Sequence, residues 1–163
     1  MISKTRLERP QRLAEAVRRF AASNASYDLL DQVTDGTWLA GGCGILASAL
    51  VLIIGEEEAR VLLIRSEKGT PQHLGVEFDG VIIDGAGGHT ARERWLASFE
   101  ERETMKGCSV HEISFRKILD RQDLEEADIC LSCDKVVIAS TIMRFYHSPE
   151  LRTLETETRA EAQ

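Results

Sequence analysis

The sequence predicts an α+β domain in which a central buried helix packs on a mostly antiparallel sheet. Residues 43–54 are apolar on nearly every side of a helix, as expected of a helix surrounded by other elements. The segments 60–65, 73–78 and 81–84 that follow are rich in branched residues, which is typical of strands. An Asp-Gly pair between the last two segments is a strong signal for a tight hairpin.

Helices are predicted ahead of this central unit. Leu13, Val17 and Phe20 recur at helical spacing behind Pro10, a residue tolerated at the start of a helix, and they predict a helix over 10–22. Ser26 is a suitable cap for a second, short helix over 27–33. The residues between this helix and Cys43 are expected to form a loop.

Further elements are predicted after the hairpin. The glycine-rich residues 85–89 are expected to form a flexible loop that leads out of the hairpin. Thr90 is expected to cap a helix whose buried side is formed by Trp95, Leu96 and Phe99. A strand around 110–115, an acidic turn or helix over 120–128 and an apolar helix over 133–145 complete the pattern. The polar residues 151–163 are expected to be a disordered tail, so that residues 1–150 form one domain.

Composition and charge narrow the classes of partner. With 20 basic and 27 acidic residues and a net charge of -7, the chain has no long-range attraction for nucleic acid or anionic membranes, and neither is expected as a partner. The first ten residues lack the apolar core of a secretory signal, which favours a cytoplasmic protein. The apolar run from Leu39 to Ile54 contains three glycines and is too short to predict a membrane span.

Cys43 is a candidate nucleophile. It lies where a glycine-rich loop meets the start of the central helix, and the positive end of a helix favours the thiolate, which is the nucleophilic form of cysteine. Gly42 and Gly44 on either side leave space for a substrate backbone and let nearby N–H groups face a developing oxyanion. The alternative interpretation is a small apolar side chain in the core.

His73 and Asp84 are candidate partners of this thiol. His73 opens one predicted strand and Asp84 closes the next, and a hairpin that pairs Phe78 with Val81 brings them within two residues of register near one end. An imidazole can take the thiol proton and a carboxylate can orient the imidazole. Taken singly, the two residues suit a surface histidine and a turn aspartate. His89 is interpreted as a surface residue, with a substrate contact near the cleft as the alternative.

The chain resembles the compact core of the papain-like superfamily in its transglutaminase-like arrangement, over about residues 36–88. The residues that carry the resemblance are Trp38, Gly41-Gly42-Cys43, Leu46-Ala47, Ala49-Leu50, His73, Val76, Gly80, Ile83-Asp84 and Gly87. The resemblance implies an acyl-transfer enzyme without a cofactor, in which Cys43 attacks a carbonyl, His73 moves the proton and Asp84 orients His73. Papain-like peptidases usually have an oxyanion-binding glutamine shortly before the cysteine, where this chain has Thr37-Trp38; the indole N–H of Trp38 and the backbone at Gly42 are the candidates for this role.

A second set of residues has the spacing of a structural zinc site. Cys108 and His111 are followed by Cys130 and Cys133. Cys130 and Cys133 have apolar neighbours, which suit the start of a helix better than a zinc knuckle. We therefore expect buried or half-buried thiols, with a zinc site as the alternative.

The sequence therefore leads to three hypotheses. The first is a thiol hydrolase or transferase, such as a cysteine peptidase, that acts on a protein, a peptide or a small acyl substrate. The second is a catalytically inactive binding module on the same fold. The third is a zinc-stabilised interaction domain.

Overall fold

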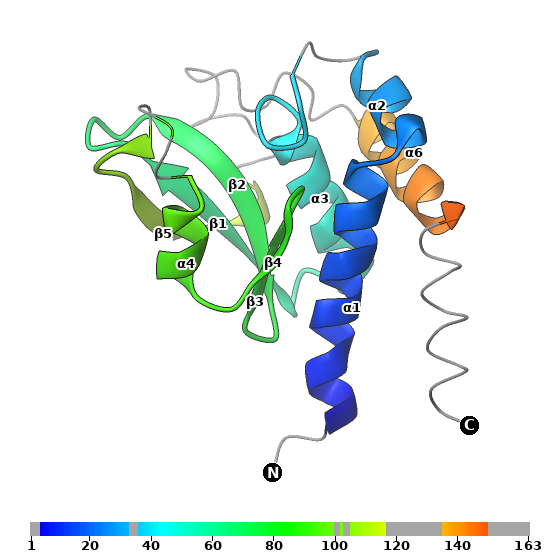
Figure 1. Cartoon of the computed structure of the whole chain (residues 1–163), viewed down its shortest axis with the longest axis horizontal. Coiled ribbons are helices and arrows are strands. Elements are labelled where there is room, and N and C mark those ends of the chain that lie inside the picture. Colours follow the sequence, from blue (N-terminus) through cyan, green and yellow to red (C-terminus); the bar gives the residue numbers. More distant parts are fainter. Residues whose placement is uncertain (1–3, 33–35, 100–101, 103–104, 117–134, 150–163) are drawn as a thin grey trace.

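The computed structural model describes residues 4–32, 36–99, 102, 105–116 and 135–149 of the chain (Figure 1). The elements in chain order are α1 (Lys4–Ala21), α2 (Asn24–Leu30), α3 (Cys43–Ile54), β1 (Ala59–Arg65), β2 (Pro71–Phe78), β3 (Val81–Asp84), β4 (Gly87–His89), α4 (Arg92–Ala97), β5 (Ser109–Ile113) and α6 (Lys135–Tyr146). The predicted α+β class is confirmed, and so is a helix that begins at Cys43 and ends at Ile54.

The five strands form one antiparallel sheet in the order β4-β3-β2-β1-β5. Helices α1, α3 and α6 lie toward one face of this sheet and α4 lies on the other (Figure 1). Along β1, Val61 and Leu63 pack with the first group of helices, whereas Leu62 and Ile64 pack with α4. This alternation is that of a strand buried on both faces.

The hairpin between β2 and β3 has the predicted turn and register. Phe78 pairs with Val81 and Val76 pairs with Ile83. Asp79 and Gly80 have φ angles of 46° and 81°, the left-handed backbone that a two-residue hairpin turn requires at both central positions. The tight turn therefore sets the position of Asp84 relative to β2.

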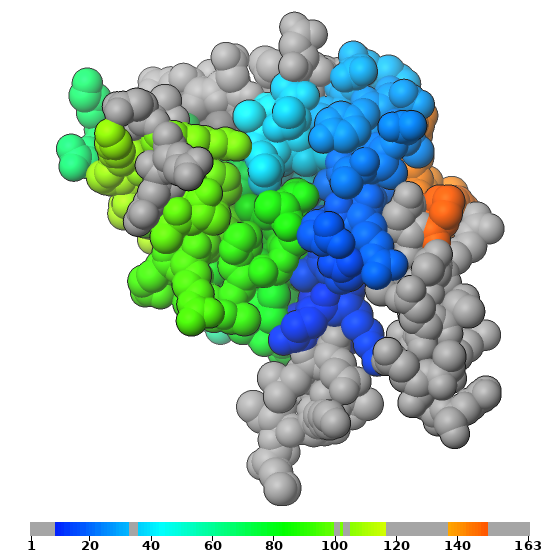
Figure 2. Space-filling view, viewed as in Figure 1, coloured from blue at the N-terminus to red at the C-terminus, as the bar shows by residue number. Residues whose placement is uncertain are grey.

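The glycine-rich segment after Asp84 differs from the prediction, because it contains a strand and not only an exit loop. Strand β4 pairs with β3 through Asp84 opposite Gly87 and Ile82 opposite His89. A Cβ atom on Gly88 would lie 2.8 Å from the Cβ atom of Ala14, so a glycine lets β4 approach α1 closely. In the space-filling view the residues of α1 lie directly against those around β4 (Figure 2).

Several helix boundaries also differ from the sequence prediction. Helix α1 begins at Lys4 with Pro10 inside it, a start that no apolar periodicity marks. Ser23, and not Ser26, is the cap of α2, because the Ser23 side chain accepts the Ser26 N–H. Ala91, and not Thr90, precedes α4 and makes no side-chain cap hydrogen bond. The predictions for 120–128 and 151–163 lie outside the described residues.

Candidate active site

Cys43 is the first residue of α3 and is only 1% exposed. Gly42 before it is the N-cap, with no side-chain cap hydrogen bond. A Cβ atom on Gly42 would lie 2.6 Å from Leu30 Cδ1, so a side chain larger than hydrogen does not fit there. The glycine therefore allows the loop and α2 to close over the start of α3, and this packing places the thiol inside the protein.

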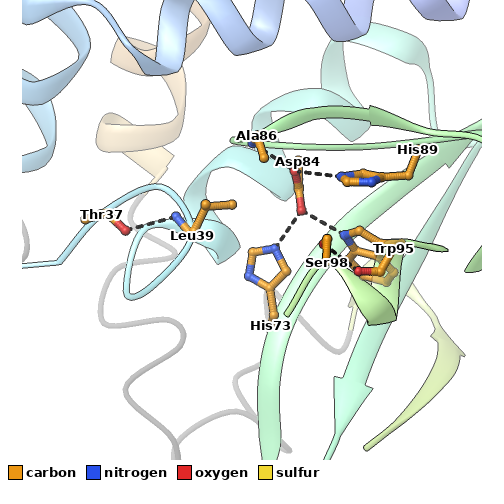
Figure 3. Close-up of polar contacts among 8 residues, drawn as sticks. All are labelled: Thr37, Leu39, His73, Asp84, Ala86, His89, Trp95 and Ser98. Carbon is orange, nitrogen blue, oxygen red and sulfur yellow. Dashed lines mark hydrogen bonds and ion pairs between the residues drawn. The ribbon is translucent and has the colours of Figure 1, made fainter. Parts of the chain in front are cut away.

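His73 and Asp84 form a buried pair, as the hairpin register predicts. His73 Nε2 lies 3.0 Å from Asp84 Oδ2, and the two residues are 0% and 2% exposed (Figure 3). The β2–β3 ladder ends with Val76 opposite Ile83, so His73, which pairs with Ile64 of β1, lies beyond the part of β2 that pairs with β3. The His73 ring is therefore beside the end of β3, where Asp84 is the last strand residue.

Cys43 also acts on the His73 imidazole, because its charge and hydrogen bonding contribute to raising the pKa of that ring. His73 Nε2 is already engaged by Asp84. The second ring nitrogen, Nδ1, is buried and has no nitrogen or oxygen partner within the described part of the chain. Nδ1 is thus the atom available to exchange a proton with the sulfur. The structure brings the three predicted residues together.

Three further groups surround the Asp84 carboxylate (Figure 3). The Trp95 indole donates to Oδ2 over 2.8 Å, the Ala86 backbone N–H donates to Oδ1 over 2.9 Å, and His89 Nε2 lies 3.7 Å from Oδ1. The roles of Trp95 and His89 at the site were not predicted. One available signal was that a buried indole N–H requires an acceptor.

The surroundings shift the pKa values of His73 and Asp84 in opposite directions. Burial lowers the pKa of His73, but hydrogen bonds and charge from Asp84 and Cys43 outweigh this effect and raise it to about 9. Burial raises the pKa of Asp84, but hydrogen bonds from His73 and Trp95 and the nearby His89 imidazole hold it well below its usual range. At neutral pH the pair is therefore an imidazolium and a carboxylate.

These shifts predict how stability depends on pH. Because folding raises the pKa of His73 from 6.5 to about 9, the stabilisation from its proton is complete below pH 6.5 and is lost as the pH rises through about 9. The lowered pKa of Asp84 contributes stability above pH 3.8, which is lost as the pH falls. Urea unfolding should show the free energy of unfolding falling by about 3 kcal/mol from pH 6.5 to above 9. The variant His73→Gln is the control, and an equal fall in both proteins would contradict the assignment to His73.

The two predicted oxyanion donors are both engaged elsewhere. The Trp38 indole N–H donates to Ser26 Oγ over 3.1 Å, and Trp38 is 3% exposed. The Gly42 backbone N–H donates to Thr37 O over 2.9 Å. In this conformation neither group is directed at a substrate, and the first turn of α3, where Cys43 lies, carries backbone N–H groups that lack intrahelical acceptors.

The loop that carries Trp38 packs against the turn after Asp84. A Cβ atom on Gly85 would lie 2.8 Å from the Cβ atom of Trp38, so the two backbones meet closely above the carboxylate. The sulfur, the imidazole and the carboxylate are all buried. A substrate can therefore reach Cys43 only if part of the cover formed by the Trp38 loop and the turn after Asp84 moves.

The zinc alternative is only partly within the described residues. Cys108 is half-buried, and His111 on β5 is exposed, with its Nε2 2.8 Å from Ser109 Oγ. Cys130 and Cys133 lie outside the described residues. Within the described ranges, the structure groups no three His, Cys, Asp or Glu side chains in a way that could hold a metal ion.

Comparison with known protein families, with curated proteins and with solved structures finds no match to this chain. Among the described residues, no helix is both long and apolar enough to cross a membrane. The site is therefore interpreted from its own geometry.

Proposed function

We propose that this protein is a thiol acyl-transfer enzyme with a papain-like core in the transglutaminase-like arrangement, a cysteine peptidase or a related transferase. The observation that carries the proposal is one chain of contacts, from Cys43 at a helix start through His73 to Asp84. The order of elements supports the papain-like assignment, since a helix begins at the cysteine and the histidine and aspartate follow on adjacent strands.

The two ring nitrogens of His73 have different roles in the proposed mechanism. Nε2–H is donated to Asp84, which orients the ring, and Nδ1 remains for the sulfur. A pKa raised to about 9 keeps the imidazole protonated at neutral pH, so it pairs with a thiolate and is ready to act as an acid. The resting state is then a thiolate–imidazolium pair.

The reaction follows from that pair. The Cys43 thiolate attacks the carbonyl carbon of an amide or ester, and the carbonyl electron pair moves to oxygen. When the tetrahedral intermediate collapses, the C–N or C–O bond breaks and the leaving group takes the Nδ1 proton, which leaves a thioester and neutral His73. His73 then accepts a proton from water or an amine that attacks the thioester, and the thiolate is released. The substrate is a protein, a peptide or a small acyl compound, and no cofactor takes part.

The burial of the site favours a second candidate, a binding module that does not catalyse a reaction. Cys43, His73 and Asp84 are each at most 2% exposed, and such a polar cluster can also serve to specify a unique core. The two candidates differ in whether a small electrophile can acylate the sulfur when the cover opens.

The test is acylation by p-nitrophenyl acetate, an activated ester small enough to enter through local opening. Peptide mapping by mass spectrometry should find the acetyl group on Cys43 within the time of the p-nitrophenol burst. Cys43→Ala should abolish the burst, and Cys108→Ala, which changes the half-buried thiol near β5, should retain it.

A folded wild-type protein that gives no acetyl group on Cys43, or acetylates Cys108 just as fast, would contradict the enzyme and favour the binding module. Zinc measured in the same purified sample at about one ion per chain would support the third hypothesis, a zinc-stabilised domain.

A further inference from the structure

His89 connects the buried cluster to the surface of the protein. Its side chain is 16% exposed, whereas those of His73 and Asp84 are 0% and 1% exposed. Its Nε2 atom is nevertheless buried and has no hydrogen-bond partner among the described residues. That atom lies 3.7 Å from Asp84 Oδ1, just beyond hydrogen-bond distance.

The backbone places His89 beside the carboxylate. His89 pairs with Ile82, and Asp84 lies two residues further along the same strand, so both side chains are on the same face of the sheet. The close approach of Gly88 to Ala14 holds this part of β4 against α1. The His89 ring therefore faces Asp84 because of the strand pairing, and Figure 3 shows the ring directed at the carboxylate.

The elements packed on β4 contribute few other charges. Strand β3 contributes Asp84, which also binds His73. Helix α1 brings Arg18 alongside Gly87, with its guanidinium bound to Glu15, and α4 begins with Arg92, which is bound to Glu77. Asp84 is thus the carboxylate that His89 faces, and the cationic groups nearby have acidic partners of their own.

We propose that His89 is a positioning residue that shares the Asp84 carboxylate with His73 in a proton-dependent way. A proton on His89 makes Nε2 a charged donor, which closes the gap to Oδ1 and draws the carboxylate toward β4. Asp84 then holds His73 less strongly. When His89 is neutral, Asp84 holds His73 without this competition from His89.

The consequence for catalysis rests on the proposed function, but the contact between the side chains does not. Because His89 is partly exposed and His73 is fully buried, His89 has the more direct access to protons from solvent. Protonation of His89 should therefore weaken the His73–Asp84 contact, and with it the proposed thiolate–imidazolium pair.

The experiment is a pH titration of the protein labelled with ¹⁵N in its histidine rings, followed by NMR. In the wild type, the His73 Nε2 resonance should shift once with its own titration and once more at the pH where the His89 resonances titrate. In His89→Gln, which keeps an amide donor but cannot titrate, the second shift at His73 should be lost. The control His111→Gln, on exposed β5, should retain it.

A His73 resonance that does not follow His89 in the wild type would overturn the proposal, and so would a second shift that persists in His89→Gln. If His89→Gln fails to fold, the wild-type titration alone still decides, because coupling is reciprocal and the His89 resonances must then also respond when His73 titrates. A protein that shows this coupling but does not acetylate Cys43 would retain the role of His89 and lose only the enzyme proposal.

Discussion

Substituting His73 by glutamine should slow the alkylation of Cys43 by iodoacetamide at least about 100-fold at neutral pH. In the proposed mechanism the imidazolium of His73 stabilises a thiolate at Cys43, and a neutral glutamine removes that charge. Alkylation traps the sulfur without a substrate, so it reports the state of the nucleophile directly. The rate is measured by mass spectrometry of the peptide that contains residue 43.

Cys108 in the same molecule is the internal reference. Burial and the nearby Glu67 raise the pKa of the Cys108 thiol, and Cys108 directly precedes β5, which β1 separates from the strand that carries His73. Its rate should be the same in both proteins. If Cys43 reacts equally fast with and without His73, then the thiolate–imidazolium pair does not exist and the catalytic role of His73 is wrong.

Substituting Asp84 by alanine should cost about 3–5 kcal/mol of the free energy of unfolding. Asp84 is 2% exposed and accepts hydrogen bonds from His73, Trp95 and the Ala86 backbone. Its removal leaves these donors without an acceptor and leaves the His73 imidazolium without its counter-charge in the interior. Urea unfolding monitored by circular dichroism at pH 6.5 measures the loss.

Asp84→Asn is the matched control, because it keeps the shape and one acceptor oxygen but not the charge. It should cost less than Asp84→Ala, about 1–3 kcal/mol, and it should also abolish the fall in stability above pH 6.5 that His73 produces. Equal stability of Asp84→Ala and the wild type would mean that Asp84 does not compensate a buried charge.

The three central residues of the site could be predicted because each has a local signal. Cys43 follows glycines where a continuous apolar run begins, and the helix starts at that residue. The Asp-Gly turn allows only one register, which brings Asp84 near His73. These signals extend over a few residues of sequence, the range in which turn geometry and helix periodicity operate.

The residues around the carboxylate could not be predicted in the same way. Trp95 reaches Asp84 because α4 packs on the sheet face that carries Ile64 and Ile82, and no nearby sequence pattern indicates which face a short helix covers. His89 lies beside Asp84 because a glycine-rich segment pairs as a strand, which its own residues do not favour. Close packing against α1 decides that pairing.

The sequence alone was thus sufficient for the α+β class, the start of the central helix at Cys43, the hairpin register and the proximity of His73 to Asp84. Tertiary packing decided that Trp38 donates to Ser26, that Trp95 and His89 enclose Asp84, and that the whole cluster is buried. The reason is physical. Backbone turns and amphipathic periodicity depend on neighbouring residues, whereas burial and hydrogen-bond partners depend on segments that meet only when the chain has folded.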